Sequence, residues 1–165
     1  MGDIGIIESS KCRIQVTDTM KFLGKIIGHV CELKEGYVNI HNTVTLSVNT
    51  TYRQCLKSHH TATHILHAVL REVLGSHIAQ KGSLVASDRL RFDISHTKPV
   101  TRAQIKLVED KVNLIIRNNS QVCTSLMSTQ LAIESGAMAL FGEKYVINLI
   151  HVVQAFLSSD AAKSP

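Results

Sequence analysis

The stretch SHHTATHILHAVLREVL, residues 58–74, decides the fold of this chain. It carries an apolar stripe at helical spacing, formed by Ala62, Ile65, Leu66, Val69, Leu70 and Val73. Ser58 is a residue type that favours the N-cap position, and Gly75 suits a C-terminal stop. The pattern therefore predicts a helix over residues 59–74.

The same helix carries several histidines. His60 and His64 are four residues apart, which places both imidazoles on one face of the helix, about one turn from each other. Two nitrogens in that arrangement can bind one Zn²⁺ ion at roughly 2.0–2.1 Å each. An amphipathic helix with several polar histidines would show the same spacing, and the spacing names no further ligand.

Strand-like segments lie on both sides of this helix. Residues 4–49 hold short alternating runs, broken by turn signals at Gly24, Gly28 and Gly36, which suggest a small barrel or meander. Residues 77–86 and 89–95 are also strand-like, with a turn between them. A second helix is expected from Thr101 to about Asn118, with Ile105, Val108, Val112, Ile115 and Ile116 facing inward. A strand near 122–127 and a short helix near 128–135 follow.

Composition limits the class of protein. With 165 residues and 44% hydrophobic residues, the chain can bury a core, although aromatic residues make up only 4%. The formal charge of +5 weakly favours a polyanionic partner such as RNA. Four separated cysteines, no leader-like start and no long apolar span predict a cytoplasmic protein with reduced thiols and no membrane segment.

Three ordered motifs resemble the editing domain of alanyl-tRNA synthetases. They are HTATHILHA at residues 60–68, QKGSLV at 80–85 followed by LRFDISH at 90–96, and GAMALFGEKY at 136–145. The start of the chain, MGDIG, also resembles the point where the β-barrel subdomain of that family begins. The resemblance covers roughly residues 1–145.

The resemblance implies an α+β fold: a small β-barrel subdomain followed by an antiparallel sheet wrapped around a metal-bearing helix. It also implies zinc-dependent hydrolysis of tRNA for alanine that carries serine or glycine. His60 and His64 would bind the zinc ion, and Gln80 would contact substrate or water in a catalytic role. Lys81, Arg89 and Arg91 could contact RNA phosphates, with Lys81 and Arg91 as the substrate-binding residues, although solvated surface charge explains them equally well.

The chain departs from the family at its end. In the family, a C-x-x-x-H motif completes the zinc site, but no cysteine follows Cys123 here, and His151 is the one histidine after Tyr145. We therefore expect a fragment truncated before that motif, with the domain order 1–50 barrel-like, 51–145 incomplete editing core, and 146–165 divergent apolar run and tail. The aminoacylation core of the synthetase is also absent.

Three functions stay open at this point. The chain could be part of an alanine-tRNA ligase that retains editing activity, or a catalytically decayed RNA-binding module without metal. A metal-storage or regulatory histidine protein ranks last, because it rests on the nine histidines alone. The sequence does not reveal the oligomeric state.

Overall fold

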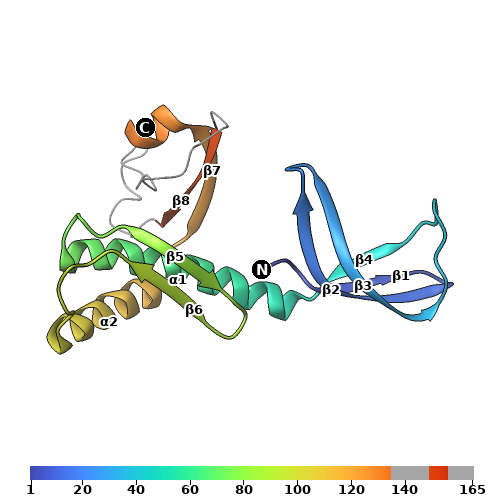
Figure 1. The fold of residues 1–165 in the computed structure, drawn as a ribbon, viewed down its shortest axis with the longest axis horizontal. Coiled ribbons are helices and arrows are strands. Elements are labelled where there is room, and N and C mark those ends of the chain that lie inside the picture. The colour runs from blue at the N-terminus through green and yellow to red at the C-terminus, as the bar shows by residue number, and fades with distance from the viewer. Residues whose placement is uncertain (135–148, 156–165) are drawn as a thin grey trace. The chain divides into compact units, whose positions relative to one another are not determined.

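The computed structural model of the chain describes residues 1–134 and 149–155 (Figure 1). The chain divides into two compact units. The first contains Met1–Thr63 and Leu84–Arg91, and the second contains His64–Ser83 and the residues from Phe92 onward. The boundary between the units falls within one long helix and within one hairpin, so each unit contains part of both elements.

The first sheet is an open, antiparallel sheet of four strands. Its strands are β1 (Gly5–Glu8), β2 (Cys12–Phe22), β3 (Ile26–Gly36) and β4 (Thr45–Val48), in the order β3-β2-β1-β4. The expectation of a barrel is therefore wrong within the described residues. A barrel needs its two edge strands to pair, and β3 and β4 do not pair with each other.

The core of this sheet lies on one face of β2. Cys12, Ile14 and Val16 alternate with polar residues and are buried, as the period of two in the sequence requires. Their neighbours on the flanking strands are far more exposed. Leu33 lies directly opposite Ile14 on β3, and its exposed fraction is 50% against 8% for Ile14. The apolar side chains on the flanking strands are therefore partly exposed around a small core.

The long helix α1 runs over Thr50–Leu74, so it begins nine residues earlier than the sequence pattern indicated. The side chain of Asn49 accepts a hydrogen bond from the Tyr52 amide at 2.9 Å, and the Asn49 carbonyl accepts one from the Arg53 amide. Asn49 is therefore the N-cap, and Ser58 lies inside the helix. The apolar face continues upstream through the buried Leu56, and no proline or glycine interrupts residues 50–58. The end of the helix at Gly75, with φ +118°, is as expected.

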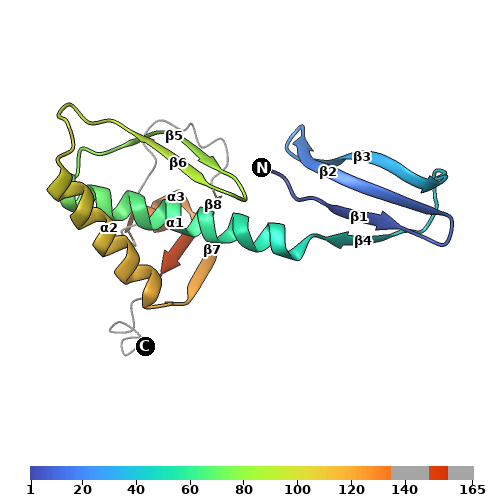
Figure 2. The ribbon, with the colours of Figure 1, turned by 90° about the horizontal axis from the view of Figure 1, so that it is seen from below.

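A two-stranded hairpin follows α1 and lies alongside it in both views (Figures 1 and 2). It consists of β5 (Gln80–Val85) and β6 (Leu90–Ile94). The Ala86 amide donates to the Arg89 carbonyl at the turn, and the Ser95 amide donates to the Ala79 carbonyl at the open end. These bonds confirm the expected antiparallel strands. A second pair, β7 (Val122–Ser128) with β8 (Leu149–Ala155), is also antiparallel. The described strands beside α1 thus form separate two-stranded sheets and not one wrapped sheet.

Helix α2 covers Arg102–Arg117 and begins at a complete capping box. The Gln104 amide donates to the Thr101 hydroxyl, and the Gln104 side chain accepts from the Thr101 amide at 2.9 Å. Val108 is buried as expected, whereas Ile105 and Ile116 are half exposed, so their inward assignment was wrong. The short helix α3 (Thr129–Glu134) confirms the expectation for that segment.

No helix in the part of the chain that the structure describes is long and apolar enough to cross a membrane. The GAMALFGEKY motif at residues 136–145 lies outside the described residues. His151 lies on β8 opposite Leu126. Cys123 lies on β7 opposite Gln154, as the strand expectation for its segment required.

Candidate functional site

Helix α1 places His60 and His64 one turn apart, and both side chains are exposed to solvent. The i, i+4 spacing puts them on a common face because the helix is continuous from Thr50 to Leu74. The helix that the motif predicted is therefore present around both histidines, and their binding of zinc stays a prediction. An exposed pair of this kind is accessible to a metal ion from solvent.

His59 holds α1 to the hairpin turn. A nitrogen of its ring, Nδ1, lies 2.7 Å from the Ala86 carbonyl oxygen and donates to it, because a carbonyl oxygen can only accept. The Thr63 hydroxyl donates to the His59 carbonyl at 2.9 Å, which gives this buried hydroxyl a hydrogen-bond partner within the helix. His59 therefore positions the start of the histidine segment.

His67 has a different environment, since it is one of two buried polar residues among those described. Its ring packs against Phe92 of β6 with 5.2 Å between the ring centroids. It bonds to the backbone of Ile78, and its Nε2 is buried without a hydrogen-bond partner. Burial lowers the pKa of His67, helped by the nearby Arg71 cation and opposed by the bond to Ile78. His67 is thus a neutral packing residue.

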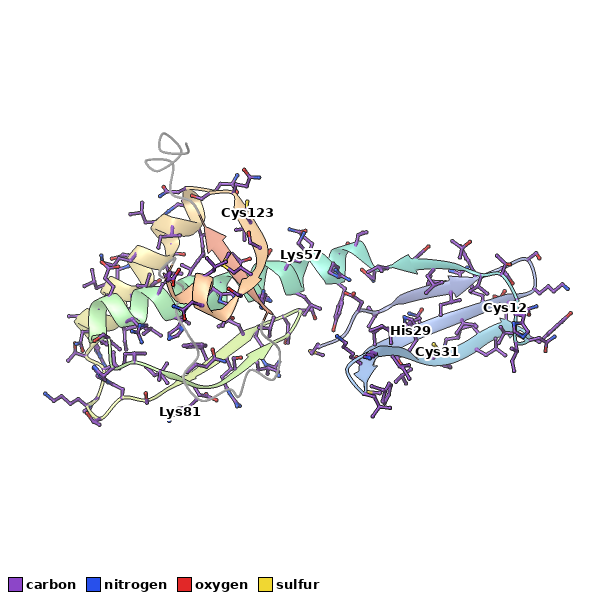
Figure 3. The ribbon with its side chains drawn as sticks, turned by 90° about the horizontal axis from the view of Figure 1, so that it is seen from above. Cys12, His29, Cys31, Lys57, Lys81 and Cys123 are labelled. Atoms are coloured by element: carbon purple, nitrogen blue, oxygen red, sulfur yellow. The ribbon has the colours of Figure 1, made fainter. Side chains whose placement is uncertain are left out.

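The other candidate residues belong to the hairpin. Gln80 is the first residue of β5, and its side-chain amide donates to the Ser83 hydroxyl at 3.2 Å. Lys81 is exposed and lies on the side of the hairpin away from α1 (Figure 3). Arg89 pairs with Asp88 at 2.7 Å in the turn, and Arg91 is exposed on β6. The basic residues are therefore accessible to a polyanion, whereas Gln80 has a local hydrogen-bond partner.

The described residues do not form a complete zinc centre. A catalytic zinc site usually has three protein ligands and an open position for water. Within residues 1–134 and 149–155, no group of three His, Cys, Asp or Glu side chains is placed to hold a metal ion. His60 and His64 supply two ligands at most. The C-x-x-x-H motif that would complete the set is not in the sequence.

A second histidine pair was missed by the sequence analysis. The Nε2 of His77 lies 3.0 Å from the Nδ1 of His96, and the two rings stack with an angle of 21° between their planes. The two residues are 19 positions apart, so no periodicity joins them. The signal that could have found them is the hairpin itself, because one histidine precedes its first strand and the other follows its second strand.

No protein-family model matches the chain. Curated relatives are nevertheless close over 145 residues, which is 88% of the chain. The alanine–tRNA ligases of Rickettsia felis, Rickettsia rickettsii and Rickettsia canadensis are 60%, 59% and 57% identical to it over that stretch. The chain spans about 16% of the length of each of these relatives.

Proposed function

We propose, from the premise that this chain is homologous to one segment of the alanine–tRNA ligases, that it is the incomplete editing segment of such an enzyme. The observation that carries the proposal is the identity of 57–60% over 88% of the chain. The segment would act on tRNA for alanine that carries serine or glycine. A pocket for alanine cannot strongly reject glycine, which is smaller, or serine, which adds one hydroxyl, so a second site that hydrolyses these errors is needed.

The residues of α1 and the hairpin support defined roles in this proposal. His60 and His64 would bind Zn²⁺, which in a complete site activates a water or polarises the ester for hydrolysis. Lys81 and Arg91 are exposed and can contact tRNA phosphates. Gln80 would contact the aminoacyl group or a water molecule after leaving its bond to Ser83.

The missing ligands set the expected level of activity. Two neutral imidazoles supply only part of the free energy of a structural zinc site, which is about 10–16 kcal/mol for four ligands. This chain should therefore retain little zinc and hydrolyse seryl-tRNA weakly or not at all. It could still bind tRNA through its excess of basic residues, which is the alternative function of an RNA-binding module without metal.

The test compares the chain with a version whose residues after 145 are replaced by a family-type ending that carries C-x-x-x-H. Zinc per chain is measured by elemental analysis, and serine and glycine release are measured from tRNA for alanine. We expect substoichiometric zinc and weak release in the chain, and a gain of both in the grafted version. A His60→Ala, His64→Ala double variant of the grafted version should lose zinc, whereas His29→Ala should not.

Three results would contradict the proposal. Near-stoichiometric zinc and full activity in the ungrafted chain would show that other residues complete the site. Equal hydrolysis of seryl-, glycyl- and alanyl-tRNA in the grafted version would show that the pocket does not discriminate. Zinc and hydrolysis both absent in the grafted version, with tRNA binding retained, would favour the RNA-binding module.

A further inference from the structure

The hairpin β5–β6 carries a side-chain cluster that the proposed editing function does not use. His77 lies between the end of α1 and β5, and His96 follows β6, so the pair joins the two open ends of the hairpin. The ring nitrogens face each other at 3.0 Å. His77 is exposed and His96 is partly exposed, so the site is open to small solutes from solvent.

We propose that His77 and His96 form a two-nitrogen site for a divalent transition-metal ion with square-planar or octahedral geometry, with Cu²⁺ as its best representative. Imidazole is a common ligand for copper, nickel and zinc. The site is separate from the pair formed by His60 and His64, and it does not depend on the proposed editing function.

The distance between the nitrogens is already close to the spacing that such an ion requires, so only a small rotation of the rings is needed. With metal–nitrogen bonds of about 2.0–2.1 Å, two nitrogens 3.0 Å apart subtend an angle of roughly 91–97° at the metal. That angle is close to the 90° between neighbouring ligands in square-planar and octahedral complexes, which Cu²⁺ and Ni²⁺ adopt. A tetrahedral ion such as Zn²⁺ needs an angle near 109°, and thus about 3.3–3.4 Å between the nitrogens.

The two rings can bind a metal ion after one proton moves between the nitrogens of a single ring. In the metal-free pair, one facing nitrogen carries a proton and the other accepts it. When the donor ring moves that proton to its outer nitrogen, both facing nitrogens present lone pairs, and neither neutral ring releases a proton overall. The rings must also rotate so that both lone pairs point to the metal ion, which would lie beside the line between the two nitrogens. Exposed side chains make such rotations readily.

The backbone prepares the position of His77. A Cβ atom added at Gly75 would lie 2.8 Å from His77 Nδ1, and Gly75 has a φ of +118°, which L side chains rarely adopt. The glycine therefore leaves the space that the His77 ring occupies. Within the described residues, no third His, Cys, Asp or Glu joins a group that could hold a metal ion, so water would fill the other coordination positions.

The test is a Cu²⁺ titration of the full chain, followed by calorimetry and by electron paramagnetic resonance of the bound ion. To remove competition, the titration is done in the His60→Ala, His64→Ala background. We expect one binding site. Its electron paramagnetic resonance spectrum should show Cu²⁺ bound by two imidazole nitrogens. His77→Ala and His96→Ala should each weaken that site about tenfold or more, because each removes one of two nitrogen ligands. His29→Ala, an exposed histidine on β3, should leave it unchanged.

Two further measurements keep the inference falsifiable if an alanine variant folds poorly. Cu²⁺ should raise the melting temperature of the chain increasingly as its free concentration exceeds the dissociation constant, because the ion binds the folded hairpin, and His96→Gln should remove that rise while retaining a polar side chain. Gly75→Ala should weaken Cu²⁺ binding by displacing His77. The inference is overturned if the double variant His77→Ala, His96→Ala retains the two-nitrogen spectrum, or if His29→Ala weakens binding to the same extent.

Discussion

His67 differs from the neighbouring histidines of α1 in lying almost entirely out of solvent, with an exposed fraction of 7%. Its ring bonds to the backbone of Ile78, whose carbonyl also accepts a hydrogen bond from Arg71 at 2.8 Å. Because the other ring nitrogen has no partner, protonation would add a charge and an unsatisfied N–H in a buried position next to the Arg71 cation. The fold therefore favours neutral His67.

This environment predicts that acid destabilises the chain through His67. The pKa of His67 is lowered in the folded state from its ordinary value of 6.5, so below that pH the unfolded chain binds more protons than the folded chain. The free energy of unfolding should fall as the pH drops below about 6.5, by at most about 1.4 kcal/mol per pH unit for this one group, and should level off below the folded pKa.

Urea unfolding between pH 7.5 and 5 measures this effect. His67→Phe keeps a ring against Phe92 and removes the titrating group, so its stability should depend less on pH than that of the unaltered chain. His29→Ala serves as the control, because His29 is an exposed residue on β3. Parallel pH profiles for the unaltered chain and His67→Phe would contradict the assignment.

At the scale of elements, the start of α1 is set by burial of its apolar face and not by the local N-cap signal at Ser58. Ser58 has the side chain of an N-cap, but the apolar stripe extends upstream to Leu56, which is buried. The helix continues because burial of that residue outweighs a cap at Ser58, and the start moves to Asn49, whose side chain accepts from the Tyr52 amide. The histidines therefore lie in the middle of the helix, where the backbone is well supported.

The position of the cap can be tested with a matched pair of substitutions. Asn49→Ala should lower the free energy of unfolding by about 1 kcal/mol, because the Tyr52 amide loses its partner. Ser58→Ala should be neutral or stabilising by roughly 0.5 kcal/mol, since alanine is a better helix former inside a helix. Chemical denaturation of both variants gives these values. The reverse order of effects would place the helix start at Ser58.

At the scale of the whole molecule, the first sheet buries β2 and leaves the flanking strands half covered. Ile26 and Leu33 on β3 and Leu46 on β4 have exposed fractions near one half, and so does Phe22 at the far end of β2. The edge strands β3 and β4 also present unpaired backbone groups within the described sheet. Exposed apolar surface next to unpaired edges is a recognised cause of association between copies of a chain. We expect the isolated chain to associate as its concentration rises.

A cross-strand pair provides the test of this expectation. Leu33→Lys should increase solubility and change the free energy of unfolding by less than about 1 kcal/mol, because Leu33 is half exposed. Ile14→Lys, directly opposite on β2, should destabilise the chain by roughly 2–5 kcal/mol, because it places a charge in the core. Light scattering and denaturation of the two variants measure both effects. Unchanged association in Leu33→Lys would show that the exposed apolar side chains of the flanking strands do not cause the association.

The sequence by itself determined the local elements. The apolar stripe and Gly75 specified the end and the inner face of α1, Thr101 specified the start of α2, and the turn between residues 86 and 89 specified the hairpin. It also identified the homology, because the ordered motifs around His60 and Gln80 are themselves sequence. These features depend on contacts within a few residues, which a pattern can express.

Only the tertiary structure decided how distant residues meet. The open sheet replaced the expected barrel because strand pairing is settled by partners far apart in the chain. The helix start, the exposure of Ile105 and Ile116, and the burial of His67 against Phe92 depend on which surfaces other elements cover. The His77–His96 pair exists because the hairpin brings its two ends together at 3.0 Å. No periodicity encodes such contacts, since their free energy is gained only when the chain has folded.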